Sequence, residues 1–145
     1  MEKQNKEFDA NSRFTGVGQI IAILGTAEHH KNRTVEDIVL NILPAVMNNQ
    51  FVVGFTDAQI SRGSETLTLR TPTSFFTWAS VDSSTHDLLL KNPDKRNLLV
   101  KKYSSGKNIW LVDSHGSENE MDILQKHVKE RLHLPSNYQF NRIKN

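Results

Sequence analysis

Cysteine is absent from this chain of 145 residues, and that absence excludes several kinds of site at once. Without thiols the chain can form no disulfide, no zinc–thiolate centre and no cysteine nucleophile. A chain without disulfides fits a reducing compartment, so we expect a cytoplasmic location. The start of the chain is polar and mixed in charge, with no pattern of a secretory or transit signal, which agrees with that expectation.

Long apolar runs and strong charge of one sign are also missing. The stretch 18–25 is among the longest apolar runs, and it is far too short to cross a bilayer, so we expect no membrane span. The net charge is only +2, and no basic stripe with interleaved aromatic residues is present. Nucleic acid is therefore not an expected partner.

What is present indicates one globular domain of mixed class. Its length suits a single core, which we expect over residues 14–145, after a polar, flexible N-terminal arm over residues 1–13. Apolar spacing predicts helices over 14–30 (loosening at 25–27), 34–49, 84–103 (interrupted at Asn92-Pro93) and 118–132. Alternation and short apolar runs predict strands over 50–55, 66–70, 74–81, 108–112 and 138–143, with a hairpin turn at 62–64.

The helix over 34–49 carries the clearest local signals. Thr34 and Asp37 have the spacing of an N-terminal capping pair, and Pro44 inside the pattern should kink the helix. Helices come first and are followed by strands mixed with helices. This order predicts an α+β (or layered α/β) fold with a mostly antiparallel central sheet flanked by helices.

Three segments resemble, in order and spacing, the toxin-activating lysine acyltransferases of the RTX (hemolysin-activating) family. The first is His30, followed by Asn41-Ile42-Leu43-Pro44-Ala45 and then Asn49-Gln50-Phe51. The second is Thr77-Trp78-Ala79, and the third is Ser105-Gly106 followed by Trp110-Leu111-Val112-Asp113. The resemblance runs from about residue 14 to residue 132.

That resemblance implies a GNAT-like acyltransferase fold and a specific reaction. Family members take a fatty acyl group from acyl carrier protein and place it on internal lysines of an RTX-type protoxin, in the cytoplasm. The implied partners are therefore acyl carrier protein and the protoxin, with a homodimer possible and no bound cofactor. The resemblance places the family's catalytic histidine at His30, its catalytic aspartate at Asp113 and its helix asparagine at Asn41.

These residue types suit acyl transfer to lysine. A lysine side chain is almost wholly protonated at neutral pH, so its attack on a thioester needs a base such as His30. Asp113 could hold the imidazole tautomer or act on the lysine itself, and a covalent acyl-histidine is a further route. Asn41 could donate to the developing oxyanion or brace the loop that carries His30.

Plainer interpretations stand beside these. A lone histidine is most often a surface residue, an aspartate after a strand is most often a turn residue, and Trp78 and Trp110 fit a core position. His29-His30 could ligate a metal, but adjacent histidines on one loop rarely hold one ion, so no metal site is expected. Phe75, with the other apolar residues Ile20, Ile23, Leu24 and Phe76, could line an acyl channel or form the core.

Two basic clusters could dock an acidic carrier protein or be solvated faces. One consists of Lys91, Lys95, Arg96, Lys101 and Lys102, and the other of Lys126, Lys129 and Arg131.

The chain also departs from the family pattern. Ala27 stands where a serine is common, the stretch 57–73 looks longer than in typical members, Ser114-His115-Gly116 replaces apolar or aromatic residues, and the C-terminus looks short. These departures motivate an alternative, a non-catalytic GNAT-like binding module. A coenzyme A enzyme is a third reading, although no glycine-rich pyrophosphate loop is visible.

Overall fold

The computed structural model describes residues 2–144, with side chains from residue 12 onward, and its elements form one four-stranded sheet with helices on both faces. The strands are β1 (Phe51–Arg62), β2 (Glu65–Val81), β3 (Asn108–His115) and β4 (Asn141–Arg142), in the spatial order β1-β2-β3-β4. β1–β2 and β2–β3 pair antiparallel, and β3–β4 pair parallel. The predicted α+β fold with a mostly antiparallel sheet is confirmed, and it is consistent with a GNAT-like acyltransferase.

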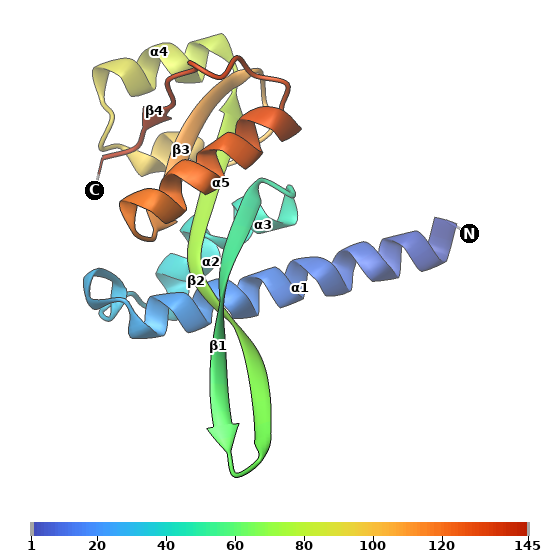
Figure 1. Cartoon of the computed structure of the whole chain (residues 1–145). Helices are drawn as coiled ribbons and strands as arrows, with labels where there is room; N and C mark the ends of the chain where they lie inside the picture. Colours follow the sequence, from blue (N-terminus) through green and yellow to red (C-terminus); the bar gives the residue numbers. More distant parts are fainter. Residues whose placement is uncertain (1, 145) are drawn as a thin grey trace.

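The helices cover opposite faces of this sheet (Figure 1). They are α1 (Glu2–Thr26), α2 (Val35–Asn41), α3 (Leu43–Met47), α4 (Ser83–Lys91) and α5 (Glu118–Arg131), with short 3-10 helices η1 (Glu28–His30) and η2 (Arg96–Leu99). Neighbouring residues of a strand face opposite sides. Phe75 accordingly packs with α1 and α3, whereas Phe76 and Trp78 pack with α5. Below this body, the β1–β2 ribbon extends as a long arm.

Local capping explains where several helices begin. The Thr34 hydroxyl accepts the backbone N–H of Asp37 at 3.1 Å, so the predicted capping pair is confirmed. Ser117 and Glu120 form a reciprocal capping box at the start of α5. The predicted single helix over 34–49 is wrong in one respect, because it is divided at Ile42 into α2 and α3. Pro44 lies in the first turn of α3, where its missing N–H costs no hydrogen bond.

The N-terminal helix is longer than predicted. It begins at Glu2 instead of Phe14 and ends at Thr26, before η1. The arm expected over residues 1–13 is therefore helical from Glu2 onward, and its flexibility stays a prediction. Residues 25–27 do mark the end of the helix, as the sequence indicated.

The two strands predicted over 66–70 and 74–81 are one strand, β2, which pairs with β1 from Phe51 to Arg62. A turn at Gly63, whose φ is +65°, closes the predicted hairpin. Pro72 is tolerated within β2 because the pairing shifts register beside it, between Gly54 and Phe55.

The last strand is shorter than predicted, and it is parallel. Only Asn141–Arg142 pair with β3, whereas the alternating pattern predicts a strand over 138–143. The aromatic rings of Tyr138 and Phe140 pack edge-on against each other, and the ring of Phe140 also packs edge-on against that of Phe76. Ring packing on the α5 face thus replaces backbone pairing in this segment.

The core consists of three apolar clusters. Trp78 and Trp110 are almost fully buried, which agrees with their core interpretation. The indole N–H of Trp110 donates to Nδ1 of His86 at 2.9 Å, so its buried polar group is paired. Ile20, Ile23, Leu24 and Phe75 form one of these clusters with α3. No helix within residues 2–144 is long and apolar enough to span a membrane.

Candidate active site

Asp113 lies near the end of β3 and is only 3% exposed. The register between β2 and β3 shifts there, because Thr77 pairs with Asp113 while Trp78 pairs with Leu111. The Asp113 backbone N–H donates to the Thr77 hydroxyl at 3.1 Å. The irregular pairing is a feature that strands use to re-aim a side chain.

Two arginines hold the Asp113 carboxylate. Arg96 of η2 donates to both carboxylate oxygens at 3.0 Å and also to the carbonyl of Val112 at 3.0 Å. Arg33, from the loop before α2, donates to one oxygen at 3.1 Å and to the other at 3.5 Å. Because the carboxylate is buried, these charge-assisted bonds are what make its ionised form tolerable.

A second carboxylate extends this network into α2. The Nε of Arg33 donates to Asp37, and the side-chain amide of Asn41 donates to the other oxygen of Asp37. The hydroxyl of Tyr103 donates to the backbone carbonyl of Asn41 at 3.2 Å. Burial opposes ionisation of Asp37, but the hydrogen bonds from Arg33 and Asn41 outweigh it and lower its pKa. The network contains two guanidiniums and two carboxylates, so its formal charges balance.

His30 is the last residue of η1 and is partly buried. Its ring lies 6.3 Å from that of Phe75 and 5.7 Å from that of His115, centroid to centroid. Burial, followed by the nearby guanidinium of Arg33, lowers the pKa of His30, while Asp113 opposes that shift. The imidazole is therefore largely neutral at neutral pH, which is the form that can accept a proton.

These groups line one cleft of about 480 Å³. Its walls comprise His29, His30, Arg33, Asp37, Arg96, Asp113 and Ser114. They come from η1, the loop that follows it, α2, η2 and β3, so segments about 80 residues apart in the sequence meet here. Within residues 12–144, no group of three histidine or acidic side chains is arranged to hold a metal ion.

The structure therefore brings His30 and Asp113 into the same cleft, whereas Asn41 does not line it. The described hydrogen bonds to the Asp113 carboxylate all come from arginines. No residue in 12–144 forms a hydrogen bond with the His30 imidazole, whose ring lies beside that of His115. The Asn41 amide is directed to Asp37. This geometry favours a bracing position for Asn41 over direct contact with a substrate oxygen.

Sequence reasoning missed Arg33 and Asp37 and misread Arg96. The sequence groups Arg96 with the lysines of the first basic cluster, but its side chain is only 19% exposed and pairs with Asp113. The sequence indicates only a capping role for Asp37. A charged residue three positions after His30 was the available signal, but nothing in the sequence identifies its partner 80 residues away.

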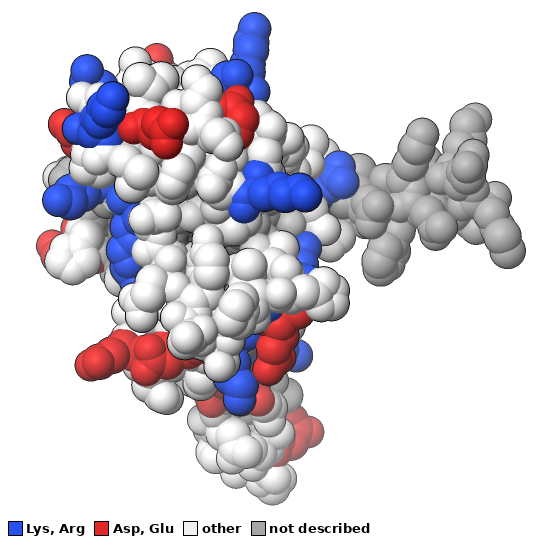
Figure 2. Space-filling model, turned by 90° about the horizontal axis from the view of Figure 1, so that it is seen from above, with Lys and Arg blue, Asp and Glu red and all other residues white. Residues whose placement is uncertain are grey.

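The basic clusters are also altered by the fold. In the first, Arg96 belongs to the cleft, whereas Lys91, Lys95, Lys101 and Lys102 are exposed, and Lys102 pairs with Asp82 at 3.2 Å. In the second, Lys129 donates to the Ser136 carbonyl and Arg131 to the carbonyls of Phe51 and Asn49. Figure 2 looks down on the top of the molecule as it is drawn in Figure 1, and it shows basic and acidic groups interleaved over that surface.

Comparison with known proteins agrees with the resemblance. The model of the RTX toxin acyltransferase family matches residues 10–140, so the chain belongs to that family. The RTX-II toxin-activating lysine-acyltransferase ApxIIC of Actinobacillus pleuropneumoniae is 23% identical over 119 residues, which are 82% of this chain and 66% of that protein. The leukotoxin-activating lysine-acyltransferase LtxC of Aggregatibacter actinomycetemcomitans is 20% identical over 122 residues, 84% of this chain and 64% of its own length. The chain thus spans slightly less than two thirds of these relatives.

Proposed function

We propose that this chain is a protein-lysine acyltransferase that moves a fatty acyl group from acyl carrier protein to internal lysines of an RTX-type protoxin in the cytoplasm. The observation that carries the proposal is one cleft, lined by both His30 and the buried Asp113, in a chain of this family. The names of its relatives support the reaction class.

In the proposed reaction, His30 is the general base. As the lysine Nζ attacks the thioester carbonyl carbon, His30 takes the proton that the amine loses. A C–N bond forms, the C–S bond breaks, and the imidazolium returns the proton to the departing sulfur. The net change is an amide and a free thiol, and the base is regenerated. General-base help of this kind contributes roughly 10²–10⁴-fold.

Asp113 acts in this proposal through the arginines. Since its oxygens accept from Arg33 and Arg96, the carboxylate fixes both guanidiniums beside the position of the base. Asn41 acts less directly, because its side-chain amide donates to Asp37, and Asp37 is the second carboxylate that accepts a hydrogen bond from Arg33. Both residues are thus proposed to position the site without touching the reacting atoms.

The carrier protein is proposed to dock on the exposed lysines beside η2, because carrier proteins of this type are acidic. Lys95 adjoins Arg96, whose side chain reaches the cleft. Charge reversal by Lys95→Glu should raise KM for the acyl carrier protein and leave kcat largely unchanged. Lys126→Glu on α5 is the matched control, and an equal rise in KM there would contradict docking beside η2.

The reaction is tested by incubating the purified chain with acyl-acyl carrier protein and a protoxin, and measuring the masses of toxin lysine peptides. A gain of one acyl group on defined lysines, dependent on the carrier protein, is expected. Binding of toxin or carrier protein without any mass gain would favour the non-catalytic module. Turnover with acyl-coenzyme A, and none with the carrier protein, would favour a different donor.

A further inference from the structure

The side chain of Arg33 connects two of the elements that line the cleft, α2 and β3. Its guanidinium contacts Asp37 of α2 and Asp113 of β3, and Arg96 of η2 contacts the same Asp113. Arg33 is 14% exposed, so these bonds are largely shielded from water. A fork with five N–H donors is what allows one side chain to bridge two carboxylates, and lysine has no such geometry.

Arg33 is also tied to His30 through the backbone. The N–H of Arg33 donates to the carbonyl of His30 at 3.1 Å, and the N–H of His30 donates to the carbonyl of Ala27 at 3.0 Å. The intervening Lys31 is exposed and pairs with Glu28 at the surface. The side chain of Arg33 ties this turn to the sheet through Asp113, and the His30 ring itself lies beside Phe75 and His115 of the sheet.

We propose that Arg33 is a positioning residue for the acyl transfer, because its bridge between Asp37 and Asp113 fixes where the His30 imidazole stands in the cleft. The inference rests on the proposed function for its catalytic meaning. The effect of Arg33 on the position and protonation of the His30 imidazole does not depend on any substrate.

Electrostatics gives this link a second component. The charged and titratable groups that face His30 are Arg33 from its own turn, Asp113 and His115 from β3, and the neighbouring His29. Burial and Arg33 lower the pKa of His30, and Asp113 raises it. Removing the guanidinium would remove a cation and also leave Asp113 less compensated, with Arg96 alone. Both changes favour protonated His30.

The experiment is an NMR pH titration of the histidine imidazole signals in the whole chain, with His30→Gln used to assign the His30 signal. Arg33→Gln should move the His30 titration midpoint upward, while Lys31→Gln, which removes the same charge two residues away, should move it less. Arg33→Lys keeps the charge but not the fork, so its midpoint should lie between those of Arg33→Gln and the unaltered chain. The indole N–H signal of Trp110, which is bonded to His86, reports whether each variant is folded.

An unchanged His30 midpoint in Arg33→Gln, or an equal rise in Lys31→Gln, would overturn the proposal. If the glutamine variant does not fold, an unchanged midpoint in Arg33→Lys overturns it and an upward shift supports it. In the acyl-transfer assay, the acid limb of the pH–rate profile of a folded Arg33 variant should shift upward together with the midpoint. Since the titration uses no substrate, it stays interpretable even if no acyl transfer is found.

Discussion

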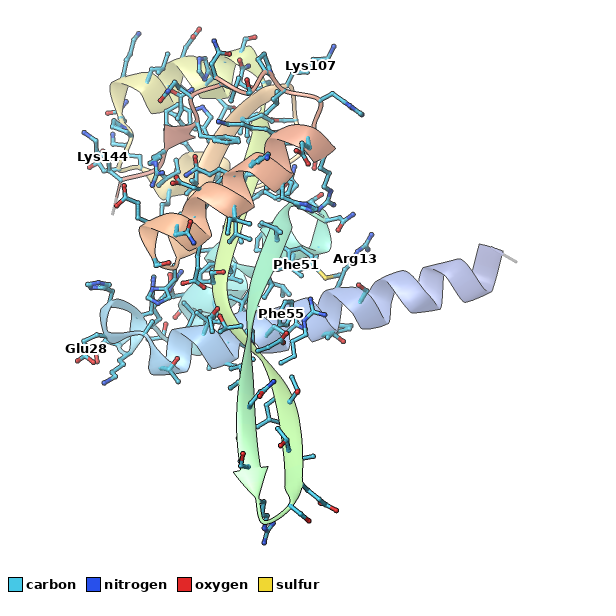
Figure 3. All side chains as sticks on the ribbon, in the orientation of Figure 1. Arg13, Glu28, Phe51, Phe55, Lys107 and Lys144 are labelled. Carbon is cyan, nitrogen blue, oxygen red and sulfur yellow. The ribbon has the colours of Figure 1, made fainter. Side chains whose placement is uncertain are left out.

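The two halves of β2 are one continuous strand in very different surroundings. Residues 74–79 are buried between α1 on one face and α5 on the other, whereas residues 65–71 are exposed in the arm. Figure 3 shows side chains crowded around the body and sparser along the arm below the labelled Phe55. The arm half pairs with β1 alone, whereas the buried half also pairs with β3. The cleft is therefore positioned by the half of β2 that has a strand neighbour in β3 and helices packed on both faces.

The arm depends instead on cross-strand contacts. Ile60 pairs with Leu67 and Ala58 with Leu69, and these leucines are about half exposed. Arg70 lies over the ring of Phe55, 4.7 Å from its centroid. Such pairs contribute roughly 0.2–1 kcal/mol each. We therefore expect changes in the body to have large effects and matched changes in the arm to have small ones.

The largest expected effect is at the buried carboxylate. Asp113→Asn removes the charge that compensates Arg33 and Arg96, and breaking a buried ion pair costs about 3–5 kcal/mol. The free energy of unfolding from urea titration should fall by this order, and acyl transfer should be lost. Asp57→Asn in the arm is the control, and a comparable loss of stability there would contradict the contrast between body and arm.

A pair of leucines tests packing alone. Leu111→Ala in β3, where the side chain is 3% exposed, should destabilise the chain by roughly 2–5 kcal/mol through lost burial and a cavity. Leu69→Ala in the arm removes the same atoms from a half-exposed position and should cost less than about 1 kcal/mol. Equal shifts in the midpoint of urea unfolding would show that the arm is buried against something in solution.

The pH dependence sharpens the role of the body. Because the pKa of His30 is lowered, its base form persists below the ordinary value of 6.5, and acyl transfer should decline only as the pH falls below that value. The native state then binds fewer protons than the unfolded chain, so His30 also disfavours folding as the pH falls through its unfolded pKa toward its folded one. A pH–rate profile whose acid limb lies above 6.5 would contradict this assignment.

Shortening the arm should have only a small effect on stability. Replacing residues 57–70 by Asn-Gly joins Thr56 to Thr71, which already pair, through a two-residue turn. The free energy of unfolding should change by less than about 1–2 kcal/mol, since few buried contacts are lost. Circular dichroism with urea unfolding measures this. A selective loss of transfer to whole protoxin, with transfer to a short lysine peptide retained, would assign the arm to acceptor binding.

Much of the fold was legible from local signals. The capping pair of Thr34 and Asp37, the turn at Gly63 and the helix ending before Pro135 follow from short-range chemistry, and α5 ends at Arg131, one residue before its predicted end. Two boundaries failed because tertiary contacts decided them. The arm and the buried half of β2 were read as separate strands, since burial changes along one pairing ladder. The tail around Phe140 was read as a strand, although its rings pack on Phe76.

The candidate site was legible only in part. His30 and Asp113 were named through the resemblance, and both line the cleft. Arg33 and Arg96 could not be assigned, because an arginine in a sequence looks like a surface charge until its carboxylate partner is known. That partner is 80 residues from Arg33 and 17 from Arg96, a pairing that no local pattern encodes.

We propose that the imidazole of His30, and not that of its neighbour His29, is the base in this cleft. The most direct test compares His30→Gln with His29→Gln by co-expression with a protoxin and acyl carrier protein, followed by mass measurement of the toxin lysine peptides. We predict that acylation is lost in His30→Gln and largely retained in His29→Gln. Undiminished acylation in His30→Gln would show that His30 is not the base.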